Sequence, residues 1–394
     1  MSGIGPAVPR VRCDRLGLFL AGLLVSGLAL RPFALLRANR IVEAQGRWIW
    51  ASLPGAEAGA VILVLGLTLA ILVPRVGAGV RLIGLAAATV LLLLAMGRAA
   101  LYLLPPGNAY ARVSPGSGFW IVLGVDLIAI ADSLARLRLR PAARLGVLAA
   151  AGLALCGFLA FGGWSGVSIL KEYQTHAESF WREFGVHIGL AVGSLVAAMI
   201  VGIPLGILCY RLRPVRVYVL NGLNILQTIP SMALFGLLMA PLAWLAAAVP
   251  AVRALGIAGI GPAPAFIALF AYALLPIVAN TAAGLAGISP LAREAAKGVG
   301  MTAVQRLFEV ELPLALPVIL TGIRVVLVQN IGLAAVAALI GGGGLGVFIF
   351  QGIAQTATDL VLLGTLPLVA LAFVAAILLD AAVEMTRVAG REED

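Results

Sequence analysis

Residues 289–313 read SPLAREAAKGVGMTAVQRLFEVELP, an amphipathic and charged segment that lies between two long apolar stretches. Ser289 is a favourable N-cap residue, and Pro290 after it suits the first position of a helix. A helix is therefore expected from Pro290 to about Gly298, where Gly298 and Gly300 end it. A folded, charged segment in such surroundings predicts a surface for a partner outside the membrane.

The second half of this segment carries its own helix signals. Thr302 followed by Gln305 has the spacing of a capping box, which predicts that a second helix begins here. We expect this helix to reach about Leu312 and to end at Pro313, because proline lacks the backbone N–H that a helix needs. Two short helices around a glycine turn follow from these signals.

Small and charged side chains make the segment suitable for docking. Ala295 and Ala296 are small, so a partner surface can approach the first helix closely. The alternative is a solvated connecting loop, which the two cap signals and the glycine turn disfavour. The charged side chains expected to serve docking are Arg293, Glu294, Lys297, Arg306, Glu309 and Glu311.

The composition places the rest of the chain in a membrane. Of its 394 residues, 62% are hydrophobic and 11% are charged, whereas soluble domains are about half apolar and a quarter charged. A crossing needs about 20 apolar residues, and hydrocarbon forces the backbone into helices. The prediction is an all-α polytopic membrane protein with about ten transmembrane helices. The expected spans are Leu16 to Leu36, Ala58 to Val73, Leu82 to Leu103, Phe119 to Leu134, Leu145 to Trp164, Gly185 to Tyr210, Val217 to Ala247, Ala265 to Leu285, Leu314 to Ile340 and Leu360 to Ala382.

The formal net charge of +10 comes from basic residues that are spread over the loops, which argues against a nucleic-acid partner. With both termini inside, roughly 17 of the 27 Lys and Arg residues lie on the cytoplasmic side, as the positive-inside rule requires. The loop that carries Arg37, Arg40 and Arg47 is an exception. The residues placed inside are Arg10, Arg12, Arg15, Arg75, Arg81, Arg136, Arg138, Arg140, Arg144, Arg211, Arg213, Arg216, Arg293, Lys297, Arg306, Arg387 and Arg391.

Two parts of the chain differ in the polarity of their spans. Residues 1–170 form an N-terminal accessory region of about five spans, with few polar residues at depth. Residues 171–184 are polar and aromatic, and we expect an outer-face interfacial helix or elbow there. Residues 185–386 form a core of about five spans, followed by a cytoplasmic tail at 387–394.

Polar residues inside the core spans are candidates for a transport pathway. Asn221, Asn224, Gln227 and Thr228 fall on about two helical turns and precede Pro230, which should kink or break the span. Broken helices at membrane depth are tolerated where they line a cavity. Equally, these amides can hydrogen-bond to neighbouring helices and hold them together.

The span after the charged segment offers a second set of polar residues. Gln329 and Asn330 are the candidates to face the same pathway, and the role of Arg324 stays open. Gly341, Gly343 and Gly344 predict a flexible hinge on the outer face rather than a dinucleotide site, because no strand precedes them. The two histidines lack metal-ligand spacing, so no metal site is expected.

The segment 289–313 resembles the EAA loop of bacterial ABC importer permeases, which reads EAA-x3-G-x9-I-x-LP. Glu294, Ala295, Ala296, Gly300, Leu312 and Pro313 match, and valine replaces isoleucine at position 310. In that family the loop seats in a groove of the ATPase subunit and passes nucleotide-driven closure to the membrane spans. The resemblance therefore implies that these six residues couple the chain to an ATPase, and we call residues 289–313 the coupling segment.

Flanking stretches narrow the resemblance to the osmoprotectant permeases, which import glycine betaine, choline or similar compounds. They are LNILQTIPSMALFGLL at 223–238, AAVAALIGGGGLGVFIFQ at 334–351 and LVLLGTL at 360–366. The similarity covers about 185–385, and the N-terminal spans look like those of a long form of this permease. It implies a type I ABC importer permease core in the C-terminal half, in the bacterial inner membrane.

The resemblance also implies the partners. The sequence contains no P-loop motif, G-x-x-x-x-G-K-[ST], so ATP and Mg are expected to be used by a separate ATPase. This chain is expected to be a transporter subunit that binds no cofactor and is not an enzyme. Two ATPases, a second permease, an extracytoplasmic substrate-binding protein and the lipid bilayer are the expected partners. One alternative is an importer of amino acids or another small solute. Another is an ion-coupled secondary transporter, for which charged residues inside several spans are expected.

Overall fold

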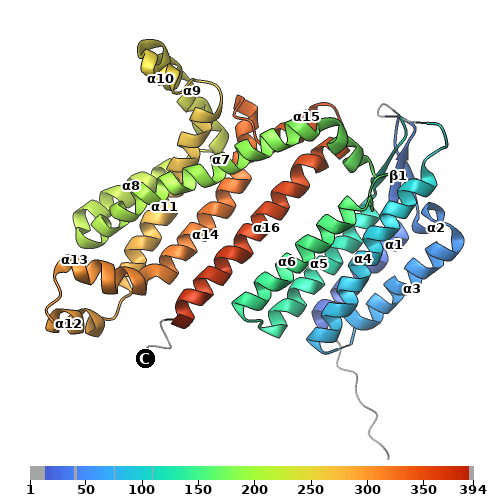
Figure 1. Ribbon diagram of the computed structural model, residues 1–394, viewed down its shortest axis with the longest axis horizontal. Helices are drawn as coiled ribbons and strands as arrows, with labels where there is room; N and C mark the ends of the chain where they lie inside the picture. The colour runs from blue at the N-terminus through green and yellow to red at the C-terminus, as the bar shows by residue number, and fades with distance from the viewer. Residues whose placement is uncertain (1–13, 40–41, 75, 109, 390–394) are drawn as a thin grey trace, which may run out of the picture. The chain divides into compact units, whose positions relative to one another are not determined.

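The computed structural model describes residues 14–39, 42–74, 76–108 and 110–389 (Figure 1). Five of the arginines considered for the topology lie outside the described residues, as does the end of the expected tail; they are Arg10, Arg12, Arg40, Arg75 and Arg391. The chain forms two compact units: unit 1 holds 1–140 and 149–175, and unit 2 holds 141–148 and 176–394.

The described chain is mainly helical, as predicted. Nine of its helices are long and apolar enough to cross a membrane, and α1 is a shorter apolar helix. This agrees with the prediction of about ten spans.

In unit 1 the elements are α1 (Arg15–Leu30), β1 (Ala34–Arg37), β2 (Gln45–Arg47), α2 (Ile49–Ser52), α3 (Gly55–Leu72), α4 (Ala78–Leu103), β3 (Arg112–Pro115) and α5 (Ser117–Leu137). The helices that cross the boundary between the units are α6 (Pro141–Ala160) and α7 (Ser168–Arg211). In unit 2 the elements are α8 (Arg213–Thr228), α9 (Ser231–Ala248), α10 (Pro250–Ala254), α11 (Pro262–Ala286), α12 (Pro290–Gly298), α13 (Ala303–Gln305), η1 (Arg306–Glu311), α14 (Leu312–Val336), η2 (Ala337–Ile340), α15 (Gly346–Ala354) and α16 (Thr358–Ala389).

Unit 1 contains a small sheet that the sequence analysis missed. The antiparallel strands β2, β1 and β3 lie side by side in that order, and Ala34 of β1 pairs with both Arg47 and Pro115. The expected first span, Leu16 to Leu36, is therefore wrong beyond Leu30. The residue before a proline is disfavoured in the helical region, and Arg31 before Pro32 is accordingly extended, with φ −129° and ψ 143°.

Glycines allow the helices of unit 1 to approach closely. A Cβ on Gly118 of α5 would lie 2.7 Å from the carbonyl oxygen of Gly27 on α1. Likewise, a Cβ on Gly17 would lie 1.9 Å from the carbonyl oxygen of Leu72 at the end of α3. Such contacts between small residues are typical of helix packing in membranes. They fix α1 against α5 along its length and against α3 at its first turn.

An ion-pair cluster joins three elements at the inner end of unit 1. Arg81 of α4 is 2% exposed, and its Nη1 lies 2.8 Å from Asp14 and 3.2 Å from Asp132. Arg136 binds the same two acids at 2.7 and 2.9 Å. Burial raises the pKa of Asp14, but the hydrogen bonds and charges of Arg81 and Arg136 outweigh it, so that the pKa lies below its ordinary value.

We predict that Asp14→Asn destabilises unit 1, because it leaves the buried Arg81 with only one acid. Breaking a fully buried pair costs about 3–5 kcal/mol, and the remaining acid should reduce this to about 2 kcal/mol. Thermal unfolding of the purified chain should show a lowered melting temperature, whereas Arg15→Gln on the exposed face should not. Because the pKa of Asp14 is lowered, the stabilisation is present above its usual pKa of 3.8 and is lost as the pH falls below it.

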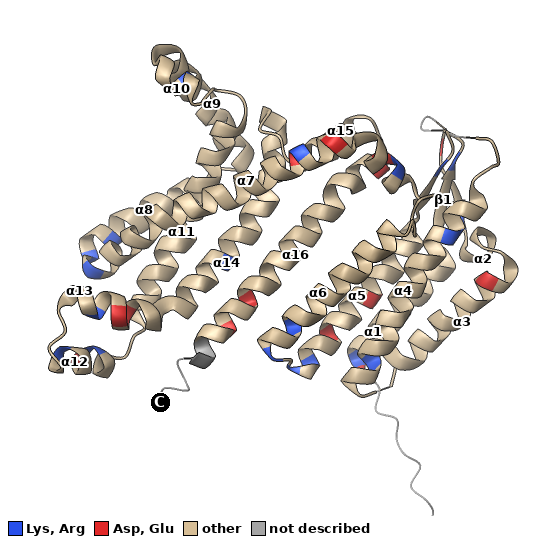
Figure 2. Ribbon diagram, in the orientation of Figure 1, with Lys and Arg blue, Asp and Glu red and all other residues tan. Residues whose placement is uncertain are grey.

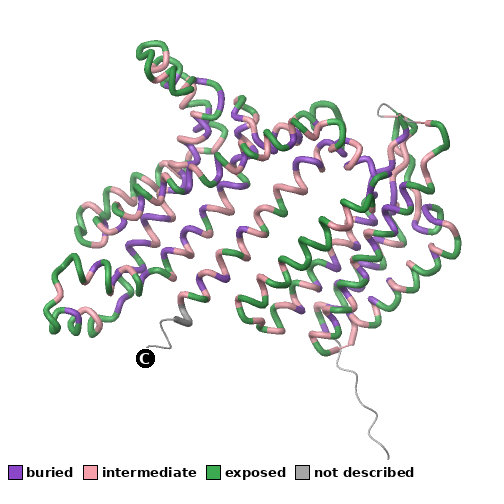
Figure 3. The backbone as a smooth tube through the Cα atoms, viewed as in Figure 1, coloured by how far each residue is buried: buried purple, intermediate pink, exposed green. Residues whose placement is uncertain are grey.

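Unit 2 is built around α11, α14 and α16, whose buried faces are seen in Figure 3. Ala273, Ile277, Ala315 and Ile319 form the centre of one apolar cluster between α11 and α14. Helix α7 is continuous except for His176, which has non-helical φ −117° and ψ 16°. Residues 171–184 therefore contain a kink between two helical parts of α7, as expected for an elbow, and their place at the membrane surface stays a prediction.

The expected span from Val217 to Ala247 is broken, as Pro230 predicted. Helix α8 ends at Thr228 and α9 begins at Ser231. Tyr272 of α11 binds the α8 side of this break: its hydroxyl donates to the Ile229 carbonyl, and its own carbonyl accepts from Gln227 Nε2 at 2.9 Å. The tyrosine satisfies backbone and amide groups that the missing helical turn leaves without partners.

Candidate functional site

The first half of the coupling segment has the predicted structure. Helix α12 runs from Pro290 to Gly298 with Ser289 at its N-cap position, although the serine side chain makes no capping hydrogen bond. Gly300 then turns the chain with φ +82°, a left-handed conformation that disfavours other residues. In the capping box, Thr302 N–H donates to Gln305 Oε1 at 2.9 Å and Gln305 N–H donates to Thr302 Oγ1 at 3.3 Å.

The predicted end of the second helix at Pro313 is wrong. Helix α13 continues into the π-helix η1, and η1 continues into α14, so that residues 303–340 form one helical segment. Pro313 lies in the first turn of α14. A π-helix closes its hydrogen bonds five residues apart, so its wider turn accommodates the proline ring and the missing N–H.

Three charged residues of the coupling segment point inward, which corrects their expected docking role. Arg293 donates from Nη2 to the Leu285 carbonyl at 2.6 Å, and its guanidinium lies 5.4 Å from the ring centroid of Tyr210. Arg306 Nε lies 3.0 Å from Glu311 Oε1, and the Glu311 side chain is only 3% exposed. The Arg293 contacts hold the coupling segment against the ends of α7 and α11, and the Arg306–Glu311 pair lies within η1.

The opposite face of the coupling segment is open to a partner. Glu294, Ala295 and Lys297 are exposed, whereas Ala296 is buried at 6%, so only the first alanine is available for close approach. Large apolar side chains accompany them, with Leu291 75% and Phe308 62% exposed. Exposed apolar side chains among charged ones indicate an interaction surface. Figure 2 shows Lys and Arg of unit 2 gathered here and at the start of α8.

Most of the predicted pathway residues lie on α8, a helix without a single buried residue. Asn221, Asn224 and Thr228 are exposed, and Thr228 donates to the carbonyl of Ile225 in its own helix. Gln227 is instead bound to Tyr272. The structure thus divides this group: Gln227 holds α8 to α11, while the others remain available at the surface of the chain.

The second pair of candidates is also divided. Asn330 is fully buried, and its Nδ2 donates to Ser194 Oγ of α7 at 2.9 Å. Ser194 in turn donates to the Leu190 carbonyl. This geometry favours the packing interpretation for Asn330. Gln329 beside it is half-buried, and its role in a pathway stays a prediction.

Arg324 has an acidic partner that the sequence analysis did not identify. Its Nη1 binds Asp380 Oδ1 of α16. Pairing with an acid is the common way to keep an arginine at membrane depth. Because the two residues are 56 positions apart, no sequence spacing indicates the pair.

The three predicted hinge glycines form a tight turn between η2 and α15. Gly341, Gly343 and Gly344 have φ of +76°, +75° and +88°, which explains the need for glycine. Glu183 of α7 accepts a hydrogen bond from Gly344 N–H at 2.8 Å. The turn is therefore held against α7 in this conformation, and a hinge motion stays a prediction.

Comparisons with known proteins find different relatives for the two parts of the chain. Residues 14–170 match the family described as ABC transporter permease YehY, N-terminal domain, and residues 202–387 match binding-protein-dependent transport system inner membrane component. The osmoprotectant import permease protein OsmW of Salmonella typhimurium is 45% identical over 187 residues, 48% of this chain and 80% of that protein. The glycine betaine/carnitine/choline transport system permease protein OpuCB of Bacillus subtilis is 35% identical over 201 residues, 51% of this chain and 85% of that protein. Among solved structures, an inward-facing MetNI methionine ABC transporter aligns with 54% of this chain and 98% of its own, at 23% identity and a TM-score of 0.48.

The chain belongs to the family of inner membrane components of binding-protein-dependent transport systems. It is the multi-pass permease subunit of an ABC importer in the inner membrane, and ATP hydrolysis takes place in partner subunits. The family works with an ATPase and a substrate-binding protein, and docking of the ATPase on the open face of the coupling segment stays a prediction. The permease prediction from the EAA pattern is thereby confirmed.

We predict that Glu294→Ala weakens the association with the ATPase without unfolding the chain, because this side chain is exposed. Loss of one anchor at an interface costs about 1–2 kcal/mol, or about a tenfold weaker association. Titration of the purified ATPase onto the chain in nanodiscs measures this change. Glu178→Ala, the same change at an exposed site on α7, should leave the association unchanged.

We predict that Asn330→Ala acts on stability and not on transport specificity. The lost hydrogen bond to Ser194 should cost about 1 kcal/mol, the size measured for bonds between membrane helices. Thermal unfolding should shift downward while the KM for the transported solute stays constant. A raised KM without a change in stability would contradict the packing role and return Asn330 to the pathway.

Proposed function

We propose that the chain imports an osmoprotectant, a glycine betaine- or choline-type quaternary amine, into the cytoplasm. The observation that carries this proposal is the similarity to permeases named for osmoprotectants, glycine betaine, carnitine and choline, which extends over 80% or more of their length. The coupling segment itself does not support one solute over another, because its exposed face serves the ATPase.

The contacts of the coupling segment support a rigid transmission of movement. Arg293 ties α12 to the end of α11, and η1 continues into α14 without a break. Leu307 of η1 is buried in the same apolar cluster as Leu285 and Ala315. Close-packed interiors transmit displacement instead of absorbing it. A movement imposed on α12 by an ATPase would therefore displace α11 and α14 together.

A second permease and two ATPases complete the proposed assembly. Support comes from α8, whose Tyr218 and Ile225 are 79% and 68% exposed beside the polar Asn221 and Asn224. Lipid is a poor neighbour for exposed amides, because hydrocarbon offers them no hydrogen-bond partner. A second permease chain facing α8 would cover them and would place Asn221, Asn224 and Thr228 between the two chains, where a solute passes.

Uptake of radiolabelled glycine betaine and choline tests the proposal. The host strain lacks its own uptake systems and expresses this chain with its ATPase and binding protein. We expect uptake that disappears on ATP depletion, falls in the Glu294→Ala variant, and persists in Glu178→Ala. Uptake that survives ATP depletion would contradict the ABC mechanism. ATP-dependent uptake of amino acids but of no quaternary amine would contradict the proposed substrate and leave the ABC mechanism standing.

A further inference from the structure

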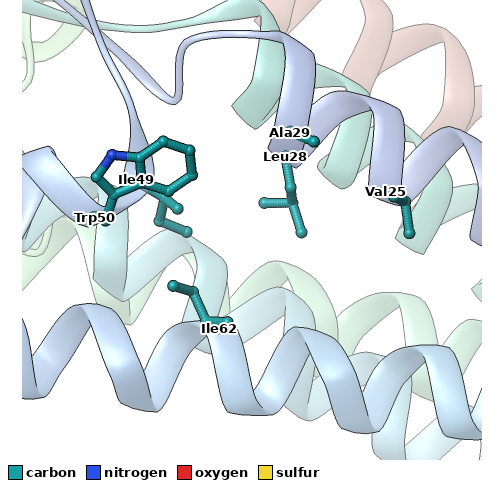
Figure 4. A pocket seen from close by; sticks show the side chains of 6 residues that line it. All are labelled: Val25, Leu28, Ala29, Ile49, Trp50 and Ile62. Carbon is teal, nitrogen blue, oxygen red and sulfur yellow. The ribbon is translucent and has the colours of Figure 1, made fainter.

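A groove opens between two helices of unit 1 in the outer half of the membrane. At their inner ends α1 and α3 are in contact, because Asp14 N–H donates to the Val73 carbonyl at 3.0 Å and Gly17 abuts Leu72. Toward the outer end, Ile49 and Trp50 of α2 line the space between the two helices. Figure 4 shows Val25, Leu28 and Ala29 of α1 on one side and Ile62 of α3 on the other.

The lining of this groove is entirely apolar. The cavity has a volume of about 200 Å3. Val25 and Ile62 are 49% and 45% exposed, so the groove is open to its surroundings along its side. A polar solute has no hydrogen-bond partner there, whereas a hydrocarbon chain loses nothing on entering. The groove residues are Val25, Leu28, Ala29, Ile49, Trp50 and Ile62.

The outer end of the groove has the features of a membrane interface. Trp50 is 56% exposed and stacks on Trp48, with ring centroids 5.5 Å apart. Tryptophan is enriched where the hydrocarbon meets the headgroups. The small sheet begins directly beyond these rings, because β2 ends at Arg47. The groove therefore runs from the headgroup level into the hydrocarbon.

Two arginines, Arg31 and Arg47, lie at this outer end. Arg31 follows α1 two positions after the groove residue Ala29, and Arg47 precedes Ile49 by two positions. Their backbones are close, because Phe33 N–H donates to the Arg47 carbonyl at 2.9 Å. Among the described residues, the Arg47 guanidinium donates from Nη2 to the neutral Gln45 Oε1 at 3.2 Å, and neither arginine forms an ion pair with a carboxylate.

The nearest acid on the groove helices does not cancel these charges. Glu57 lies in the first turn of α3, but its carboxylate is bound by Arg98 of α4 at 2.7 Å. A positive outer end therefore adjoins an apolar groove. This combination is complementary to a molecule with an anionic head and a hydrocarbon tail.

We propose that the N-terminal unit binds one anionic phospholipid of the outer leaflet in this groove. One acyl chain lies between α1 and α3 under Trp50, and the headgroup phosphate lies at Arg31 and Arg47. Burial of the acyl chain supplies affinity, and the arginines distinguish anionic from zwitterionic headgroups. The site gives the N-terminal spans a function that does not depend on the transported solute.

Native mass spectrometry of the full-length chain tests the proposal, with phosphatidylglycerol and phosphatidylcholine of equal acyl length as probes. We expect one phosphatidylglycerol to be retained at concentrations where phosphatidylcholine is not. Each basic residue near a lipid surface contributes about 1 kcal/mol, so Arg31→Gln/Arg47→Gln should weaken phosphatidylglycerol binding by about tenfold or more. Ala29→Phe, which fills the groove, should remove the retention of either lipid at this site.

Matched variants separate a specific site from general lipid contact. Arg37→Gln/Arg253→Gln removes the same charge from the far end of β1 and from α10, and should leave phosphatidylglycerol retention unchanged. Melting temperatures near that of the unchanged chain exclude unfolding as the cause. Equal retention of both lipids, or equal losses in the two double variants, would overturn the proposal. Loss of binding on adding inorganic phosphate would likewise overturn it, because the acyl chain would then contribute nothing.

Discussion

The structure depends on one constraint, which is that hydrocarbon offers no hydrogen-bond partner to a peptide group. Within a helix, backbone groups satisfy the constraint by hydrogen bonding to one another. Where a helix stops, other groups must supply these hydrogen bonds. At the break before Pro230, Tyr272 of α11 supplies them. At the turn after η2, the Glu183 carboxylate accepts a hydrogen bond from the Gly344 N–H. After the end of α1, the pairing of β1 with β2 and β3 supplies the backbone hydrogen bonds.

The same constraint explains the character of the coupling segment. Outside the membrane a loop has no need to be ordered, yet Arg293 binds this one to the ends of α11 and α7, and the Arg306–Glu311 pair orders it internally. Buried ion pairs add little stability, but they favour one arrangement over others. A permease driven by a soluble ATPase requires a coupling segment with one ordered arrangement, because a flexible loop would absorb the movement that it has to transmit.

Sequence patterns predicted the elements that local chemistry decides. The helix start after Ser289, the capping box at Thr302, the left-handed Gly300 and the break at Pro230 follow from signals within a few residues, and the structure has each of them. The inward direction of Arg293, the partner of Arg324 and the burial of Asn330 depend on residues from distant helices. Pro313 misled the prediction because a π-turn, which has no sequence signal, accommodates it.

By itself, the sequence determined that this chain crosses the membrane many times, that one span breaks at Pro230, and that residues 289–313 match the EAA loop of ABC importer permeases. Those properties follow from apolar length, caps and spacing, which are local and additive. Only the tertiary structure decided which charges face the partner, which amides are left exposed on α8, and where α1 and α3 separate beneath Trp50. These depend on which helix faces meet, and packing between distant segments has no counterpart in local sequence.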